Sequence, residues 1–174
     1  EWLASNWQGK AIGSLVADRP YNQTGLSLKV LEKVGRSLCK VPEDMDLHSE
    51  IKNILKYRTK CIYSGKDINM AFAEALAFGT LMKKFEAGEE DESEDNNGKS
   101  NIDHPPVNVR LSGQDSIRGT FNQRHAKIVC QKTSKTYWQL NNMDVKDQAT
   151  ISVCNSALSE AAVLGFEYGY SLSN

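Results

Sequence analysis

One residue that could do chemistry is Glu160, which ends the short sequence Leu-Ser-Glu before an apolar stretch. A glutamate acts best as a general acid when apolar surroundings raise the pKa of its carboxyl group. Four neighbours could provide such surroundings: Leu158, Ala161, Val163 and Leu164. The alternative is a carboxylate in the first turn of a helix, favoured there only by the helix dipole.

A second polar pair, Gln114 and Asp115, follows an expected strand that ends at Ser112-Gly113. Ligands of open α/β sheets gather at the carboxyl ends of strands, so both residues are candidates for ligand binding. Asp115 could instead simply face water in a glycine-containing turn.

Three further charged residues have two interpretations each. Arg124 and His125 could orient the carboxylates of a substrate or cofactor, because guanidinium forms bidentate bonds and imidazole can transfer protons. They could equally bridge core and surface at the start of a strand. Glu74 lies within an alanine-rich helix, where a lone acid is costly unless it is paired. We expect a hydrogen bond to another helix or subunit there rather than catalysis.

The cysteines and histidines do not indicate a metal site. They are widely separated and form none of the short-range pairs that supply metal ligands from one turn or one helical face. We therefore expect buried free thiols and no metal held by this segment alone.

The elements that position these residues follow from hydrophobic periodicity and turn signals. We expect helices over residues 26–38, 49–63 and 68–85, the last capped by Asp67, and a further helix over 157–170. Strands are expected over 107–111, 126–131, 136–140 and 150–153. This order predicts an α/β fold, with a sheet flanked by helices and preceded by a helical linker. The linker is assigned to 1–66 and the α/β domain to 67–174, with a flexible acidic insertion at 86–106.

Several motifs occur in an order that resembles one enzyme family. The first is Ile68 to Gly79, followed by Arg-Leu-Ser-Gly-Gln-Asp from Arg110, Arg-Gly-Thr-Phe from Arg118, and Gln-Arg-His-Ala from Gln123. Asn-Ser-Ala-Leu-Ser-Glu from Asn155 and Gly-Phe-Glu-Tyr-Gly from Gly165 complete the series. Together they look like the first, decarboxylating component of 2-oxoglutarate dehydrogenase and its 2-oxoadipate relative. The resemblance covers residues 26–174, interrupted by the acidic insertion.

This resemblance implies a thiamine diphosphate enzyme that decarboxylates a 2-oxo acid and transfers the acyl group to lipoamide. The segment would be the pyrimidine-binding domain, while magnesium would be held by an upstream domain. Glu160 would be the catalytic glutamate, and Gln114, Asp115 and Leu158 would bind the cofactor beside it. Arg124 and His125 are weaker candidates for substrate binding. The implied partners are a second copy of the subunit and a lipoyl-bearing succinyltransferase, in the mitochondrial matrix of a eukaryote or the cytoplasm of a bacterium.

Composition narrows the other possibilities. The chain has 21 basic and 22 acidic residues and no basic cluster interleaved with aromatics, so nucleic acid is not an expected partner. No apolar run reaches the roughly 18 residues of a membrane span. The chain begins without Met and stops after an apolar stretch, and we therefore expect part of a longer chain, inactive alone. The alternatives are a 2-oxoadipate-specific enzyme or a non-catalytic interaction domain of the same fold.

Overall fold

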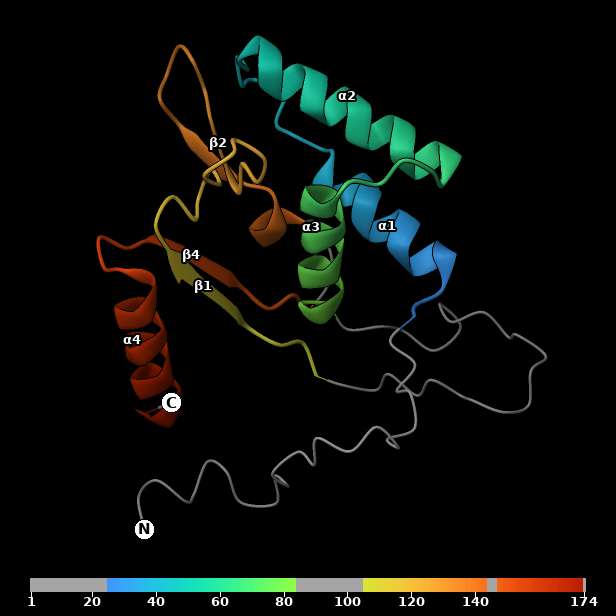
Figure 1. Cartoon of the computed structure of the whole chain (residues 1–174). Coiled ribbons are helices and arrows are strands. Elements are labelled where there is room, and N and C mark those ends of the chain that lie inside the picture. The colour runs from blue at the N-terminus through green and yellow to red at the C-terminus, as the bar shows by residue number, and fades with distance from the viewer. Residues whose placement is uncertain (1–24, 84–104, 144–146, 174) are drawn as a thin grey trace, which may run out of the picture.

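The computed structural model describes residues 25–83, 105–143 and 147–173 (Figure 1). The amino-terminal part of the expected linker and nearly all of the acidic insertion lie outside these ranges. The elements, in chain order, are α1 (Leu28–Leu38), α2 (Ser49–Ser64), α3 (Met70–Leu81), β1 (Val109–Gly113), β2 (Lys127–Val129), β3 (Thr136–Trp138), the 3-10 helix η2 (Leu140–Asn142), β4 (Ile151–Asn155) and α4 (Glu160–Ser173). The expected α/β fold, with helices preceding and flanking a parallel sheet, is confirmed.

Local signals explain where the first helices begin and end. The Ser27 side chain accepts a hydrogen bond from the Val30 amide at the start of α1. Gly65 ends α2 in the left-handed conformation, with φ of 64°, as its glycine predicts. The prediction that Asp67 caps α3 was wrong. Asn69, not Asp67, accepts from the Phe72 amide, because Asp67 has a positive φ of 61° two residues earlier.

The parallel sheet pairs two strands that are distant in sequence. β1 and β4 run side by side, with Val109 opposite Ile151 and Gly113 opposite Asn155. β2 and β3 form a separate antiparallel hairpin, as the two expected strands over 126–131 and 136–140 allow. Because β1 and β4 are parallel, their carboxyl ends lie at the same edge of the sheet.

The core lies where α1 and α3 meet the sheet and η2. Its buried side chains include Val34, Leu38, Phe72, Leu76, Met82, Leu140, Met143, Ile151 and Val153. Gly79 lets α3 approach closely, since a Cβ atom there would lie 2.6 Å from Cγ1 of Val34. Helix α3 buries Phe72, Leu76, Gly79 and Thr80 on its core-facing side, whereas Met70 at its first turn is exposed.

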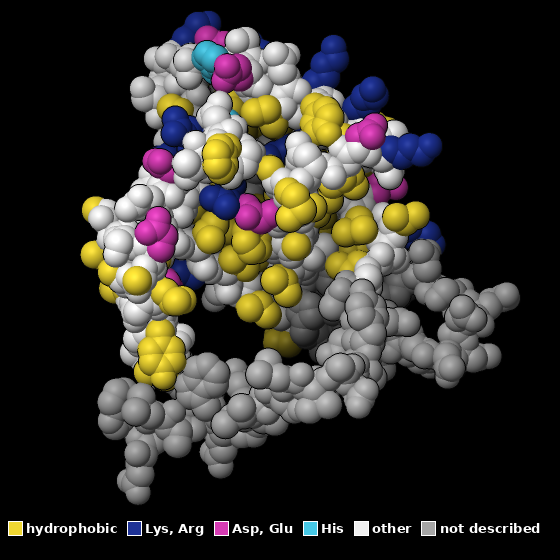
Figure 2. All heavy atoms as spheres, in the orientation of Figure 1, with side chains coloured by type: hydrophobic (Ala, Val, Ile, Leu, Met, Phe, Trp, Pro, Cys, Tyr) yellow, Lys and Arg dark blue, Asp and Glu magenta, His cyan; other side chains and the backbone are white. Residues whose placement is uncertain are grey.

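Helix α4 differs from the other helices because none of its residues is buried. It begins at Glu160, three residues later than expected, and lies beside β1 at the margin of the described structure (Figure 1). Exposed large hydrophobic residues on it are Leu164, Phe166, Tyr168 and Tyr170. Hydrophobic side chains are visible at the surface in the same region of the space-filling view (Figure 2).

Candidate functional site at the carboxyl ends of β1 and β4

The two expected groups of cofactor-binding residues meet at one edge of the parallel sheet. Gln114 follows β1 directly, and its Nε2 donates a hydrogen bond to the Leu158 carbonyl oxygen at 3.2 Å. The Ser156 amide donates to the Gly113 carbonyl at 2.8 Å. These contacts join the turn after β1 to the turn that leads from β4 into α4, and so bring Gln114 close to the start of the helix that carries Glu160.

Glu160 lies at this edge on an open groove of about 410 Å³. The groove is lined by Ser112, Gly113, Gln114, Leu158, Glu160, Val163, Leu164 and Glu167. The Glu160 side chain is exposed, and within the described ranges no hydrogen bond or ion pair engages its carboxyl group. It is therefore available to a ligand in the groove.

The apolar surroundings expected around Glu160 are only partly assembled. Leu158 and Leu164 border the groove, but 44% and 72% of their surfaces are exposed. The described residues thus place apolar side chains beside Glu160 without enclosing it.

Asp115 is placed differently from Gln114. It adopts a left-handed backbone, with φ of 54°, and is exposed in the turn after β1. Its carbonyl oxygen accepts from the Gly119 amide at 2.7 Å. Its side chain does not line the groove that contains Glu160, in line with the alternative of a water-facing residue in a turn.

Arg124 is held by Glu74 on α3. Glu74 is paired, as expected, but its partner lies in the loop before β2 and not on another helix or subunit. Arg124 Nε lies 2.6 Å from Glu74 Oε1, and Nη2 lies 3.1 Å from Oε2. A third bond, from Nη1 to the Ser116 carbonyl at 2.7 Å, joins the pair to the loop after β1. Arg124 thus uses its guanidinium for internal contacts.

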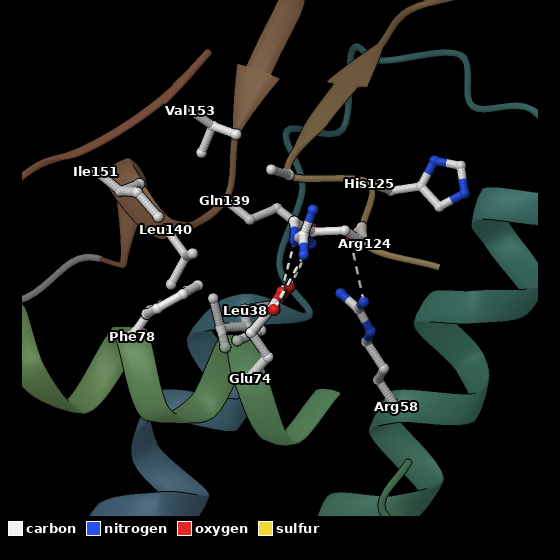
Figure 3. A pocket seen from close by; sticks show the side chains of 12 residues that line it. Leu38, Arg58, Glu74, Phe78, Arg124, His125, Gln139, Leu140, Ile151 and Val153 are labelled. Carbon is white, nitrogen blue, oxygen red and sulfur yellow. Dashed lines mark hydrogen bonds and ion pairs between the residues drawn. The ribbon is translucent and has the colours of Figure 1, made fainter. Parts of the chain in front are cut away.

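His125 projects away from the Glu74–Arg124 pair (Figure 3). Its backbone has a positive φ of 46°, and its Nε2 is buried without a hydrogen-bond partner among the described residues. Burial is the main cause that lowers the pKa of the imidazole, and the nearby Arg58 guanidinium lowers it further. His125 and Arg124 border a small cavity of about 20 Å³, which has room for one water molecule and is distinct from the Glu160 groove.

A contact that the sequence interpretation missed joins α4 to β1. Glu167 accepts hydrogen bonds from Arg110 Nε, at 3.0 Å to each carboxylate oxygen, and from Ser112 Oγ at 2.5 Å. The hydrogen bond from Ser112 is the largest cause that lowers the Glu167 pKa, and Arg110 adds to it. The alternation of Arg110 and Ser112 on one face of a strand was the signal that both could reach the same partner.

Three further findings concern metal binding, the cysteines and membrane spans. Among the described residues, no group of three or more His, Cys, Asp or Glu side chains could hold a metal ion. The four cysteines are free, with Cys61 and Cys130 buried and Cys39 and Cys154 partly buried. No helix within the described ranges is long and apolar enough to cross a membrane.

Comparison of the sequence with those of known proteins identifies relatives along the whole chain. No family model matches the chain. The mitochondrial 2-oxoglutarate dehydrogenase of Schizosaccharomyces pombe is 42% identical over 176 residues, and the 2-oxoglutarate dehydrogenase E1 components of Brucella anthropi and Brucella melitensis are 37% and 39% identical over 174 residues. Each match covers 100% of this chain and 15% of the relative, so the chain spans about one seventh of their length. Along its whole length the chain is therefore homologous to a segment of the 2-oxoglutarate dehydrogenase E1 component, which confirms the family resemblance that its motifs indicated.

Proposed function

We propose that this chain forms the pyrimidine-facing part of a thiamine diphosphate site in a 2-oxoglutarate dehydrogenase-type E1 component. The observation that carries the proposal is the unengaged carboxyl group of Glu160 on a groove shared with Gln114 and Leu158. Polar groups at the edge of an otherwise apolar groove suit a flat ring with polar atoms at its rim. Bound thiamine diphosphate would supply a carbon nucleophile that attacks the 2-oxo group and accepts the electrons released on decarboxylation.

Each residue at the groove has a separate part in this proposal. Glu160 would hold a proton at its carboxyl oxygen and donate it as a hydrogen bond to a ring nitrogen of the bound cofactor. Gln114, which is fixed by its hydrogen bond to the Leu158 carbonyl, lies at the same edge of the groove. Leu158, Val163 and Leu164 offer apolar surface to the ring and limit the access of water. Magnesium would be held by the upstream domain that the family resemblance implies.

The proposed substrate is 2-oxoglutarate, in line with the printed names of the relatives. Its acyl product would pass to the lipoyl group of a succinyltransferase. The alternative, 2-oxoadipate, rests on the sequences Gln123–Ala126 and Val129–Gln131, which look closer to that relative. One additional methylene changes discrimination by only about 10–200-fold in kcat/KM, so the two substrates must be compared directly in competition. Arg124 is held by Glu74, and His125 borders a separate cavity with room for one water molecule, so neither residue is assigned to the substrate in this proposal.

The proposed homodimer is in line with the exposed side of α4. Leu164, Phe166, Tyr168 and Tyr170 are the kind of side chains that a second subunit covers. Sedimentation of the enzyme that contains this segment should give twice the subunit mass. A monomer that retains full turnover would contradict this part of the proposal.

The test uses a chimaera in which this chain replaces the matching segment of the fission yeast relative. With thiamine diphosphate and magnesium bound, deuterium exchange at the thiazolium carbon is compared in the unmodified chimaera, Glu160→Gln and Glu32→Gln. Loss of general acid help should slow exchange in Glu160→Gln by about 10²–10⁴-fold. Glu32 lies on α1 and serves as a control of the same chemical change, for which exchange should stay unchanged.

Two outcomes would contradict the proposal. Unchanged exchange in Glu160→Gln would leave Glu160 as a carboxylate favoured only by the helix dipole. An unmodified chimaera that folds and binds the cofactor but neither exchanges nor turns over would favour the alternative of a non-catalytic domain.

A further inference from the structure

Helix α4 is attached to the sheet mainly through polar contacts. None of its residues is buried, so apolar packing within the described chain does little to fix its orientation. Its connection to β4 is short, and the Gln114–Leu158 bond holds only the turn before the first helical residue. Rotation of α4 about its axis is therefore restrained mainly by side-chain contacts between α4 and β1.

Glu167 is the residue that makes this contact. Both of its carboxylate oxygens lie 3.0 Å from Arg110 Nε, and Oε1 lies 2.5 Å from Ser112 Oγ. Arg110 also packs against two rings of the same helix, 4.5 Å from the Tyr170 centroid and 5.8 Å from that of Phe166. Arg110 therefore holds α4 in two ways, by hydrogen bonds to Glu167 and by contacts with the rings of Phe166 and Tyr170.

Glu167 and Glu160 share one face of α4. They are separated by about two helical turns, which brings their side chains onto the same side of the helix. Both border the same groove, together with Ser112 and Gln114. A helix is rigid over this length, so a contact that sets the direction of Glu167 also sets the direction of Glu160.

We propose that Glu167, held by Arg110 and Ser112, is a positioning residue that fixes the rotation of α4 and thereby directs Glu160 into the groove. This inference rests on the proposed function of Glu160. Glu167 itself donates no proton in this arrangement, because its oxygens already accept hydrogen bonds from Arg110 and Ser112. The two carboxylates of α4 thus have different tasks, one held in place and the other free to meet a ligand.

The first test measures the orientation of α4 in this chain by NMR. Glu167→Gln and Ser112→Ala should each weaken the nuclear Overhauser contacts between the Tyr170 ring and Arg110, and should raise amide hydrogen exchange in α4. Amide hydrogen exchange in α1 and α3 should stay unchanged, since the contacts of these helices do not involve the clamp formed by Glu167, Arg110 and Ser112. Glu32→Gln, which removes an ion pair on α1, is the matched control and should leave α4 as it is. Unchanged contacts and exchange in both clamp variants would overturn the proposal.

The second test asks whether Glu167 acts through Glu160, using the chimaera described above. Glu167→Gln should slow deuterium exchange at the thiazolium carbon by about tenfold to a hundredfold, because small misplacements of a reacting group have effects of this size. In the Glu160→Gln background, the same substitution should produce no further loss, since the group it positions is already absent. Equal losses in both backgrounds would show a general structural effect and overturn the inference.

The two proposals fail in different ways. No effect of Glu160→Gln on exchange would remove the proposed function, and the inference with it. A large effect of Glu160→Gln, combined with normal exchange in Glu167→Gln, would overturn the inference alone. If Glu167→Gln does not fold, Ser112→Ala is the deciding variant, because it keeps the ion pair between Arg110 and Glu167 and removes one hydrogen bond. Normal deuterium exchange at the thiazolium carbon in Ser112→Ala would then overturn the inference.

Discussion

Glu74 and Arg124 form an ion pair in which Nε lies 2.6 Å from Oε1 and Nη2 lies 3.1 Å from Oε2 (Figure 3). The pair joins α3 to the loop after β1, and the Arg124 bond to the Ser116 carbonyl extends it. Arg58, which is 4% exposed, donates to the Arg124 carbonyl from α2. One arginine thus connects two helices to the loop that precedes β2.

Removal of this ion pair should destabilise the chain. Glu74→Gln leaves the partly buried Arg124 without its counter-charge, and hydrogen bonds to charged groups contribute roughly 1.5–3 kcal/mol. We expect the free energy of unfolding in urea to fall by about 1–2 kcal/mol, toward the lower end because the side chains are partly exposed. Glu32→Gln breaks a more exposed pair on α1, where 54% and 43% of the side chains are exposed, and should lower the free energy of unfolding clearly less than Glu74→Gln does. Equal losses in the two variants would contradict the prediction.

Much of the fold follows from local sequence signals, while the contacts around the site do not. The periodicity of α1 and α2 and the glycine at position 65 predicted those elements closely, because their determinants lie within a few residues. The sequence also placed Gln114 at the end of β1. The choice of Asn69 over Asp67 depended on the backbone conformation of the turn, which composition does not reveal.

The clamp on α4 shows why the rest could not be predicted. Arg110 and Glu167 are 57 residues apart, and their contact depends on how α4 leaves β4. In the sequence, Glu167 stands out only as part of the motif Gly-Phe-Glu-Tyr-Gly. Helix α4 is mostly apolar, yet none of its residues is buried within the described structure. Local patterns predict elements, whereas the partner of a charged side chain depends on tertiary arrangement.

Two glycines should respond in opposite ways to the same substitution. In Gly79→Ala, the new Cβ would lie 2.6 Å from Cγ1 of Val34 and 3.2 Å from Sδ of Met143, so the Val34 side chain must shift or α3 must move away from α1. Overpacking of this kind costs typically about 1–3 kcal/mol. Gly165 lies in α4 with no heavy atom near its ideal Cβ, and alanine is favoured over glycine in a helix by up to about 1 kcal/mol.

Thermal unfolding of both glycine variants tests this contrast. Gly79→Ala should lower the Tm, whereas Gly165→Ala should leave it unchanged or raise it, with added helical signal in circular dichroism. An unchanged Tm for Gly79→Ala would mean that Val34 and Met143 move aside without cost.

His125 should remain neutral at pH 7. Burial lowers the pKa of its imidazole, and Arg58 and Arg118 lower it further, while the Asn122 backbone and Glu50 oppose the change. Because the folded-state pKa lies below the unfolded value of about 6.5, its contribution to stability is present above that pH and is lost as the pH falls through the folded-state pKa. NMR titration of the ring protons should give a midpoint below about 6.5. Arg58→Gln should raise the midpoint, and a midpoint above the unfolded value would contradict the prediction.

Attachment of α4 to β1 should weaken in acid. The hydrogen bond from Ser112 and the contact with Arg110 lower the Glu167 pKa, so ionised Glu167 is favoured in the folded chain. A carboxyl group with a depressed folded-state pKa contributes stability above its unfolded value of about 4.3, and this contribution is lost as the pH falls through the folded-state pKa. The carboxyl carbon of Glu167 should therefore titrate below about 4.3, and the nuclear Overhauser contacts between Tyr170 and Arg110 should decline in the same step. In Glu167→Gln these contacts should be weak already at pH 7 and should not change over that step. Contacts that persist in the wild-type chain after Glu167 is fully protonated would show that the aromatic packing of Arg110, rather than the ion pair, holds α4 in place.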